Sequence, residues 1–452
     1  MNRQERKCPA RLSVCDSFGR PPRAYNDSAL RIRRALPLAL CLARALEADK
    51  GVDLAAKAEQ LARQGNSAAA LETLAQASQQ TANSAAAEDH IGFLYQVLGH
   101  GDEAVRHFRA AAAKDPKLAL AHYHLGVALW IGQLRVAALS ELEEAVRLAP
   151  STFDYRYRLG AAYLDLAEFE KAGEELSEAT KLPGATAEAW NFLGRALQKN
   201  HDLAGASSAY EHALEMQPGN DTYRRDYALM LTETRRADAS IAEFHNILQH
   251  DPNNSDAWIN IGYAHLKQGK YDEAAADFRK ALTHDPDSPA AHYDLGIALK
   301  MTDQIEAAQK ELAEAIRLDP ALPEARYTLG ITNWQLGDFA GTIEQMRAAI
   351  RLRPDYAEAH YTLGIALRQS GHLDAAMAEL REAIRLDPTT PGPYNSLGQI
   401  LRIKGDKQGS QEAFAAGARL KRDADAQLSN TLEQGMRGGT MPNPIPSGHE
   451  HR

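Results

Sequence analysis

Hydrophobic positions along most of the chain fall into two helical stripes separated by a short polar break. Residues 289–322 illustrate the pattern. The first stripe has the i, i+3, i+4, i+7 spacing of an amphipathic helix and consists of His292, Leu295, Gly296 and Leu299. A second stripe follows Asp303-Gln304 and consists of Ala308, Leu312, Ala315 and Ile316. It ends at Asp319-Pro320, because proline lacks the N–H that a helix needs to continue. The pattern predicts a helical hairpin.

The same pattern recurs every 34 residues. Glycine occupies one position of the first helix, and Ala228 replaces it once; the glycines are Gly92, Gly126, Gly160, Gly194, Gly262, Gly296, Gly330, Gly364 and Gly398. Proline closes most units, at Pro116, Pro150, Pro218, Pro252, Pro286, Pro320, Pro354 and Pro388. Two alanine columns accompany them on the second helix. We expect these small residues to let antiparallel helices approach closely, while a column of larger residues, from Phe108 to Phe414, fills the gap between them.

These columns of small residue, alanine, large apolar residue, alanine and proline resemble the tetratricopeptide repeat family. The resemblance covers ten units: 85–118, 119–152, 153–186, 187–220, 221–254, 255–288, 289–322, 323–356, 357–390 and 391–424. It implies an all-α fold, an α-solenoid in which stacked antiparallel helix pairs form a right-handed superhelix. It also implies that the first helices line a concave face on which extended or helical peptides dock.

Both ends of the array depart from the pattern. Residues 51–84 keep its spacing but lack the closing proline, so we expect a degenerate repeat that caps the N-terminal end. At residues 425–452 we expect a short capping helix, reaching about Gln434, followed by a disordered Gly/Pro-rich tail. The fifth unit, 221–254, has Ala228 for glycine and Ile247 for alanine, which makes it our candidate for a bend between the units before and after it.

Composition excludes several classes of protein. Hydrophobic residues at 44% and charged residues at 25% are typical of a protein that folds in water, and no apolar run approaches the length of a membrane span. Cys8, Cys15 and Cys41 all precede the repeats, so neither disulfides nor cysteine-bound zinc can stabilise the repeats.

Charge is distributed unevenly along the chain. Residues 1–50 carry a net charge of +6, which leaves a net charge of −15 on residues 51–452. An acidic body disfavours nucleic acid as a partner.

The first fifty residues form a basic leader. Residues 31–45 contain a basic cluster, a short apolar stretch and Ala43-Arg44-Ala45, which has the form of a signal-peptidase site. Thirty residues precede this segment, and Pro37 and Arg44 interrupt it. Two hypotheses therefore stay open. The protein is cytoplasmic with a disordered leader, or it is periplasmic or secreted if residues 31–45 act as a signal peptide.

No sequence motif points to catalysis. The chain contains no phosphate-binding G-x-x-x-x-G-K-[ST], no H-E-x-x-H, no G-x-S-x-G and no C-x-x-C motif. His122, His292 and His360 recur at one column on the packing face, where an interhelix role is the natural interpretation. The sequence therefore predicts no enzyme, no catalytic residue, no metal site and no cofactor.

Three columns of the first helix lie beside its packing stripe, at the fifth, ninth and twelfth positions of each unit. By resemblance these columns line the groove. Tyrosine and tryptophan offer broad, stiff surface with a polar tip, which suits recognition of a protein partner. The predicted partner-binding residues are Tyr123, Trp130, Tyr157, Arg195, Tyr263, Tyr293, Tyr327, Trp334, Tyr361 and Arg368. The alternative is that single tyrosines only bridge neighbouring hairpins.

The sequence thus favours a non-enzymatic scaffold that binds a protein or peptide partner on its concave face to assemble a complex. An exported envelope or periplasmic assembly factor, and a regulatory subunit of a separately encoded enzyme, are the alternatives. Family members that grip the C-terminal carboxylate of chaperones have a lysine and an asparagine in the first two groove columns. No unit here has that pair, so this mode is not expected.

Overall fold

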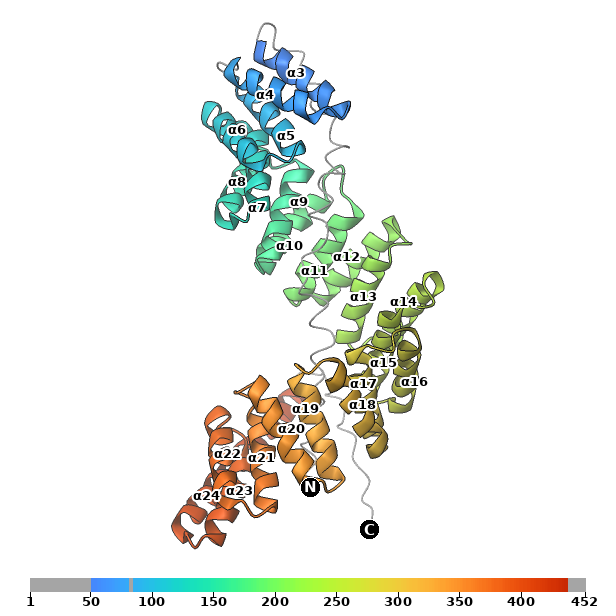
Figure 1. The fold of residues 1–452 in the computed structure, drawn as a ribbon, viewed down its shortest axis with the longest axis vertical. Coiled ribbons are helices and arrows are strands. Elements are labelled where there is room, and N and C mark those ends of the chain that lie inside the picture. Colours follow the sequence, from blue (N-terminus) through green and yellow to red (C-terminus); the bar gives the residue numbers. More distant parts are fainter. Residues whose placement is uncertain (1–49, 81–83, 438–452) are drawn as a thin grey trace. The chain divides into compact units, whose positions relative to one another are not determined.

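The computed structural model describes residues 50–80 and 84–437, with side chains to Gln427. These residues form 22 helices and no strand, and the helices are paired and stacked (Figure 1). The all-α architecture expected from the sequence is confirmed. The basic leader, including the signal-like segment 31–45, lies outside the described residues.

Each odd-numbered helix pairs with the even-numbered helix that follows it, and we call these the first and second helix of a repeat. In the N-terminal half the helices are α3 (Lys50–Arg63), α4 (Ser67–Gln80), α5 (Ala85–Val97), α6 (Gly101–Lys114), α7 (Ala119–Ile131), α8 (Arg135–Leu148), α9 (Phe153–Asp165), α10 (Phe169–Thr180), α11 (Ala187–Lys199), α12 (Leu203–Met216) and α13 (Asp221–Glu233). They continue with α14 (Ala237–His250), α15 (Ser255–Gln268), α16 (Tyr271–His284), α17 (Pro289–Met301), α18 (Ile305–Leu318), α19 (Pro323–Gln335), α20 (Phe339–Leu352), α21 (Ala357–Gln369), α22 (Leu373–Leu386), α23 (Pro391–Ile403) and α24 (Lys407–Arg437).

The turn inside every hairpin contains one residue in the left-handed region, again at intervals of 34. Glycine occupies it at Gly65, Gly99, Gly269, Gly337, Gly371 and Gly405, with φ between 75° and 86°. Gln133, Ala167, His201, Arg235 and Asp303 occupy it in the other hairpins, with φ between 60° and 63°. A residue with a Cβ pays about 1–2 kcal/mol in this conformation. The hairpin therefore imposes the turn even where the sequence lacks the glycine that favours it.

The glycine column makes room mainly for the column of large residues on the second helix. A Cβ added at Gly160 would lie 2.6 Å from Leu176 Cγ, and one added at Gly262 would lie 2.7 Å from Phe278 Cε1. The alanine backbone is also close, since the added Cβ would be 3.1 Å from the Ala138 carbonyl oxygen at Gly126 and 3.4 Å from that of Ala308 at Gly296. The close helix approach expected from the sequence is present, but its reason is the side chain that inserts against the glycine.

Hydroxyl residues replace alanine in the facing column of three repeats, and each finds the same acceptor. The side-chain hydroxyl donates to the backbone carbonyl twelve residues earlier, from Ser240 to Ala228 at 2.8 Å, from Thr342 to Gly330 at 3.1 Å and from Ser410 to Gly398 at 2.9 Å. A buried hydroxyl with a partner costs little. This geometry explains why the column accepts serine and threonine besides alanine.

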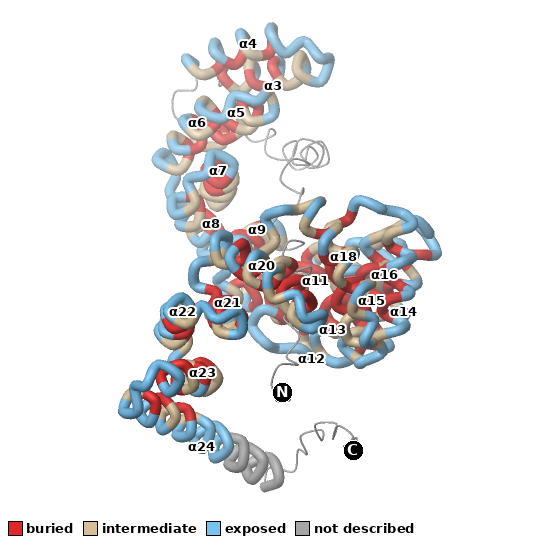
Figure 2. The backbone as a smooth tube through the Cα atoms, turned by 60° about the horizontal axis from the view of Figure 1, so that its bottom comes forward, coloured by how far each residue is buried: buried red, intermediate tan, exposed pale blue. Residues whose placement is uncertain are grey.

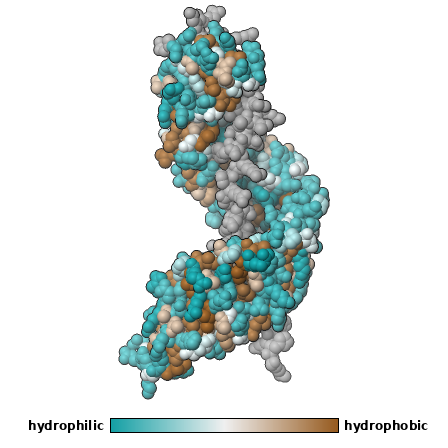
Figure 3. Space-filling model, viewed as in Figure 1, coloured by the Kyte–Doolittle hydropathy of each residue, from teal (hydrophilic) through white to brown (hydrophobic). Residues whose placement is uncertain are grey.

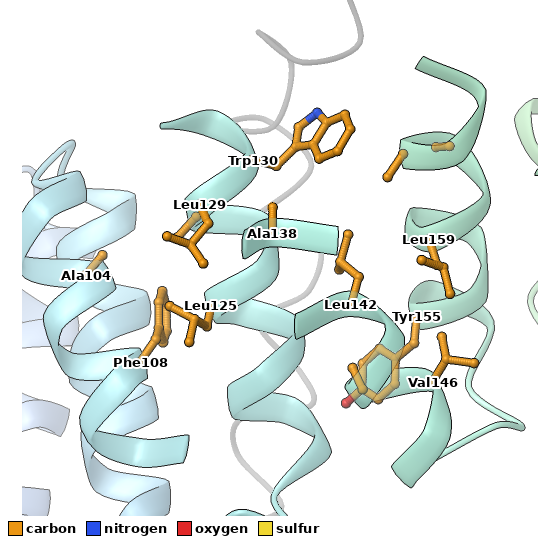
Figure 4. Close-up of a cluster of buried hydrophobic side chains, with 14 of the residues drawn as sticks. Ala104, Phe108, Leu125, Leu129, Trp130, Ala138, Leu142, Val146, Tyr155 and Leu159 are labelled. Atoms are coloured by element: carbon orange, nitrogen blue, oxygen red, sulfur yellow. The ribbon is translucent and has the colours of Figure 1, made fainter. Parts of the chain in front are cut away.

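Within each of the two compact blocks described below, the core continues from one hairpin to the next because each second helix also packs against the first helix that follows it. Phe108 of α6 points toward Leu125 of α7, and Leu142 of α8 faces Leu159 of α9 (Figure 4). Phe108 is 1% exposed. Each large residue therefore contributes to its own hairpin and to the interface with its neighbour, as expected for stacked repeats.

The repeats divide into two compact blocks. The N-terminal block ends at Ile247 and the C-terminal block begins at Leu248, so the boundary falls within α14, in the repeat that departs most from the pattern. The bend at this repeat stays a prediction. In the described parts of the chain, no helix combines the length and apolar character needed to cross a membrane.

The C-terminal end differs from the expected separate capping helix. The second helix of the last repeat, α24, continues without a break from Lys407 to Arg437. Residues 421–427 are all exposed, and this end of α24 appears pale blue in Figure 2. No glycine or proline interrupts residues 418–434, which explains why the helix does not fold back. The tail after 437 lies outside the described residues.

Candidate functional site

The first helices of neighbouring repeats contact one another and form a continuous surface within each block, which we call the first-helix wall. In the N-terminal block α5 contacts α7, and α11 contacts both α9 and α13. In the C-terminal block α15, α17, α19, α21 and α23 follow one another in the same way. The three columns predicted to bind a partner all lie on these helices.

Three of the ten predicted binding residues are buried. Trp130 is 3% exposed, Tyr263 is 9% and Tyr293 is 6%. Trp130 belongs to the hydrophobic core of its block, and the Arg135 guanidinium lies 4.1 Å from its ring centroid. The prediction that these three rings are open to a partner is therefore wrong for this structure. Neighbouring side chains enclose them, an effect that position within a helix does not reveal.

The other seven predicted residues are half-buried. They are Tyr123, Tyr157 and Arg195 in the N-terminal block and Tyr327, Trp334, Tyr361 and Arg368 in the C-terminal block. Each therefore keeps part of its surface in contact with solvent while the rest packs against the protein. Partial burial fixes the side-chain conformation, which lowers the entropy lost when a partner binds.

In the N-terminal block the tyrosines link neighbouring repeats. The ring centroids of Tyr123 and Tyr155 lie 4.7 Å apart in a stacked arrangement, and those of Tyr157 and Phe192 lie 5.8 Å apart. Burial raises the pKa of Tyr155 to about 12 and also raises the pKa of Tyr123. These phenols therefore stay protonated at neutral pH. The bridging role considered for single tyrosines is present here.

In the C-terminal block the wall presents aromatic rings on two adjacent helices. Tyr327 of α19 lies 5.0 Å from Tyr356 between ring centroids, and Trp334 meets Phe339 edge-on at 4.9 Å. Tyr361 of α21 reaches α23, since a Cβ on Gly392 would lie 2.7 Å from its hydroxyl oxygen. Tyr327 and Tyr361 pack against the core of this block, and both tyrosines and Trp334 are half-buried. Figure 3 shows hydrophobic patches over α19 and α20 within a largely hydrophilic surface.

Tyr356, which lies in the connection before α21, is not among the residues predicted from the sequence. The ring of Tyr356 packs against the ring of Tyr327. The guanidinium of Arg353 lies 4.6 Å from the centroid of the Tyr356 ring, and Arg353 also forms an ion pair with the buried Glu324. Burial, with Tyr327 and Tyr293 nearby, raises the pKa of Tyr356 well above its ordinary value. The sequence feature that could have indicated Tyr356 is an aromatic residue in a connection that otherwise lacks large apolar side chains.

Each recurring histidine connects its first helix to the second helix of the same hairpin and to the proline that precedes the hairpin. His122, His292 and His360 each place Nδ1 within 2.7 Å of a glutamate on the second helix, and Nε2 within 3.2 Å of the carbonyl oxygen of the preceding proline. Arg156 and Arg224 make the same two contacts in their repeats. Arginine cannot serve as a metal ligand here, so the shared column has a structural role. In the described residues no three His, Cys, Asp or Glu side chains are grouped to hold a metal ion.

One cluster has the distances of a catalytic triad. Ser78 Oγ lies 3.1 Å from His107 Nε2, and His107 Nδ1 lies 2.6 Å from a carboxylate oxygen of Glu88. Ser78, however, stands at the C-terminal end of α4, where backbone carbonyls carry partial negative charge that disfavours an oxyanion. Lys114 also pairs with Glu88 at 2.7 Å. The contacts among Ser78, His107 and Glu88 therefore connect α4 to the hairpin of α5 and α6, and they suit a packing role rather than acyl transfer.

The buried Glu88 carboxylate makes stability dependent on acid. Burial alone raises its pKa, but hydrogen bonds from Lys114 and His107 outweigh burial and hold the pKa below its ordinary value of 4.5. A carboxyl whose pKa is lower in the folded state stabilises the fold above its unfolded pKa and loses that contribution as pH falls through the folded value.

We therefore expect Glu88→Gln to lower the free energy of unfolding at pH 7 by about 1–3 kcal/mol. The difference from the wild type should shrink below pH 4.5, because the wild-type carboxylate then takes up a proton. Urea unfolding at a series of pH values measures both effects. The exposed Glu72 of the preceding helix, changed to glutamine, is the control. A difference that stayed constant with pH would contradict the assignment.

Comparison with known proteins agrees with the architecture. Family models described as "Tetratricopeptide repeat" match residues 94–151, 187–220, 255–288, 278–310 and 327–391.

The BBSome complex member BBS4 of Mus musculus is 26% identical over 153 residues, which are 34% of this chain and 29% of that protein. Its Drosophila melanogaster homolog is 26% identical over 163 residues, 35% of this chain and 34% of that protein. The chain thus spans about a third of the length of these curated relatives. Among solved structures, MamA from Desulfovibrio magneticus RS-1 is 24% identical with a TM-score of 0.36, covering 38% of this chain and 97% of that one.

Proposed function

Because the chain belongs to the tetratricopeptide repeat family, we propose that it is a non-enzymatic scaffold that binds a protein or peptide partner on its first-helix wall. The observation that carries the proposal is the group of half-buried aromatic and basic side chains on adjacent helices of the C-terminal block, namely Tyr327, Trp334, Tyr361 and Arg368. Aromatic rings held by packing are the usual anchors of protein interfaces. Two curated relatives are themselves named as members of a protein complex, which supports a binding role.

The first test is capture of partners from the native source by the full-length chain, followed by affinity measurement with the purified partner. We expect the double change Tyr327→Ala and Trp334→Ala to weaken the complex by about 2 kcal/mol or more, roughly 30-fold in Kd. Both rings lose their contact with the partner, while the fully buried core below them is untouched.

The matched control changes exposed residues on a second helix of the same block. Leu352 is 43% exposed and Arg351 is also exposed, both on α20. Leu352→Ala with Arg351→Ala should leave affinity within about twofold of the wild type, since such surface changes are usually small. Circular dichroism should show the same helix content in both double variants. Wild-type affinity in the Tyr327/Trp334 variant would refute the proposed surface.

A further inference from the structure

The first-helix wall of the C-terminal block carries a regular arrangement of chemistry over its last four repeats. Its three columns read Tyr293, Tyr327, Tyr361 and Asn395; then Ile297, Ile331, Ile365 and Gln399; then Lys300, Trp334, Arg368 and Arg402. The first column is thus mostly tyrosine, the second is mostly isoleucine, and the third has three basic residues and one tryptophan. None of these twelve residues is acidic, although the chain as a whole has a net charge of −9.

The arginines of this row differ in their surroundings from those on the second helices. Arg317 and Arg385 each pair with a glutamate three residues earlier on the same helix, at 2.6 and 2.5 Å. Arg368 instead donates to the side-chain oxygen of Gln399, and the Arg402 guanidinium lies 6.0 Å from the Phe414 ring. In the part of the chain that the structure describes, no carboxylate forms an ion pair with Arg368 or Arg402. Among the described side chains, both guanidinium groups therefore have neutral neighbours instead of an anionic partner.

The isoleucine column gives these cations an apolar neighbour. Ile331 and Ile365 are both half-buried. Ile331 packs with Tyr327 and Tyr361 against the core of this block. An arginine beside partly dehydrated surface pairs more strongly with a carboxylate than one surrounded by water. Its planar guanidinium also accepts a carboxylate with two parallel hydrogen bonds.

Resting on the proposed function, we infer that the C-terminal wall binds a partner segment in which apolar residues lie beside Asp or Glu. The apolar side chains would lie over Ile331 and Ile365, between the tyrosines and the cations. The carboxylates would face Arg368 and Arg402. Charge complementarity selects this partner, because the same row repels basic segments and raises the association rate of acidic ones.

A random 12-residue peptide library selected against the full-length chain tests the inference. We expect the selected peptides to be enriched in Asp and Glu next to Leu, Ile or aromatic residues. For the strongest peptide, replacing its acidic residues by Gln and Asn should raise Kd by about 10-fold at low salt, and less at high salt, because the interaction is partly exposed. Fluorescence anisotropy with the labelled peptide measures both values.

The key variant is Arg368→Gln with Arg402→Gln, matched by Arg317→Gln with Arg385→Gln on the second helices. In the wall variant the acidic peptide and its amide analogue should bind equally, whereas the control should keep the 10-fold difference. A selection without acidic enrichment, a control as affected as the wall variant, or tighter binding of a 20-nucleotide single-stranded DNA would overturn the inference. If peptides bind through Tyr327 and Trp334 but without charge preference, the inference fails and the proposed function stands. If those two rings do not matter, the proposed function fails as well.

Discussion

Replacing Phe278 by alanine is expected to lower the free energy of unfolding of its repeats by about 3–5 kcal/mol, the cost of emptying a large core position. Phe278 is fully buried, and its ring fills the space beside Gly262 of the first helix. It also belongs to the cluster that joins α16 to α17 through Ala291 and Leu295. One truncation therefore weakens a hairpin and the stacking of the next repeat together.

Hydrogen exchange followed by mass spectrometry is the measurement of choice, because an array of repeats opens locally and a single melting temperature averages over its parts. Peptides from α15, α16 and α17 should exchange faster in the variant, and the urea midpoint should fall. Arg279→Ala, one residue away and exposed, should change stability by no more than about 0.5 kcal/mol. Exchange that rose equally along the whole chain would show that the repeats do not act as nearest neighbours.

Replacing Gly160 by valine is expected to cost about 3 kcal/mol, the upper part of the range for overpacking a core. The Cβ alone would lie 2.6 Å from Leu176 Cγ and 3.2 Å from the Leu176 backbone nitrogen. Leu176 is fully buried, so relieving the clash requires a shift of its packed side chain or of the two helices. Branching at Cβ adds further atoms to the same crowded space.

The same hairpin provides the control. Gly173 of α10 has space around it, since an added Cβ would be 3.6 Å from its nearest neighbour, Leu197 Cδ2. Gly173→Ala should therefore stabilise the fold by up to about 1 kcal/mol through helix propensity. Urea unfolding of both variants and of Gly160→Ala gives the comparison. Equal stability of the Gly160 and Gly173 variants would mean that the glycine column has no packing role.

Much of the fold could be predicted because the information is local and repeated. A hydrophobic stripe of period 3.6 defines each helix, and its recurrence every 34 residues defines the hairpins. Even the tolerated exceptions obey the pattern, as Ser240 and Thr342 show by bonding to a carbonyl that the hairpin always supplies. The reason assigned to the glycine column was incomplete, because the inserting partner, Leu176 or Phe278, lies on the other helix.

The binding surface was less predictable. The columns beside the packing stripe do lie on the first helices, but three rings of the ten predicted residues proved buried. The support of Tyr327 by Tyr356 was also missed, because Tyr356 belongs to a connection and not to a helix column. The sequence also did not show which arginines form ion pairs. Arg385 pairs with Glu382 on its own helix, whereas Arg368 donates to Gln399 of the next repeat.

By itself the sequence determined the 34-residue spacing of the hairpins, the helical face that each residue occupies and the placement of small and large residues, because these depend on spacing along one chain. Only the tertiary structure decided which side chains on the edge of that face stay exposed, which charges lack a partner and that the last helix continues unbroken. Those properties depend on atoms that neighbouring helices bring into contact, and a residue's position within its own helix does not specify them.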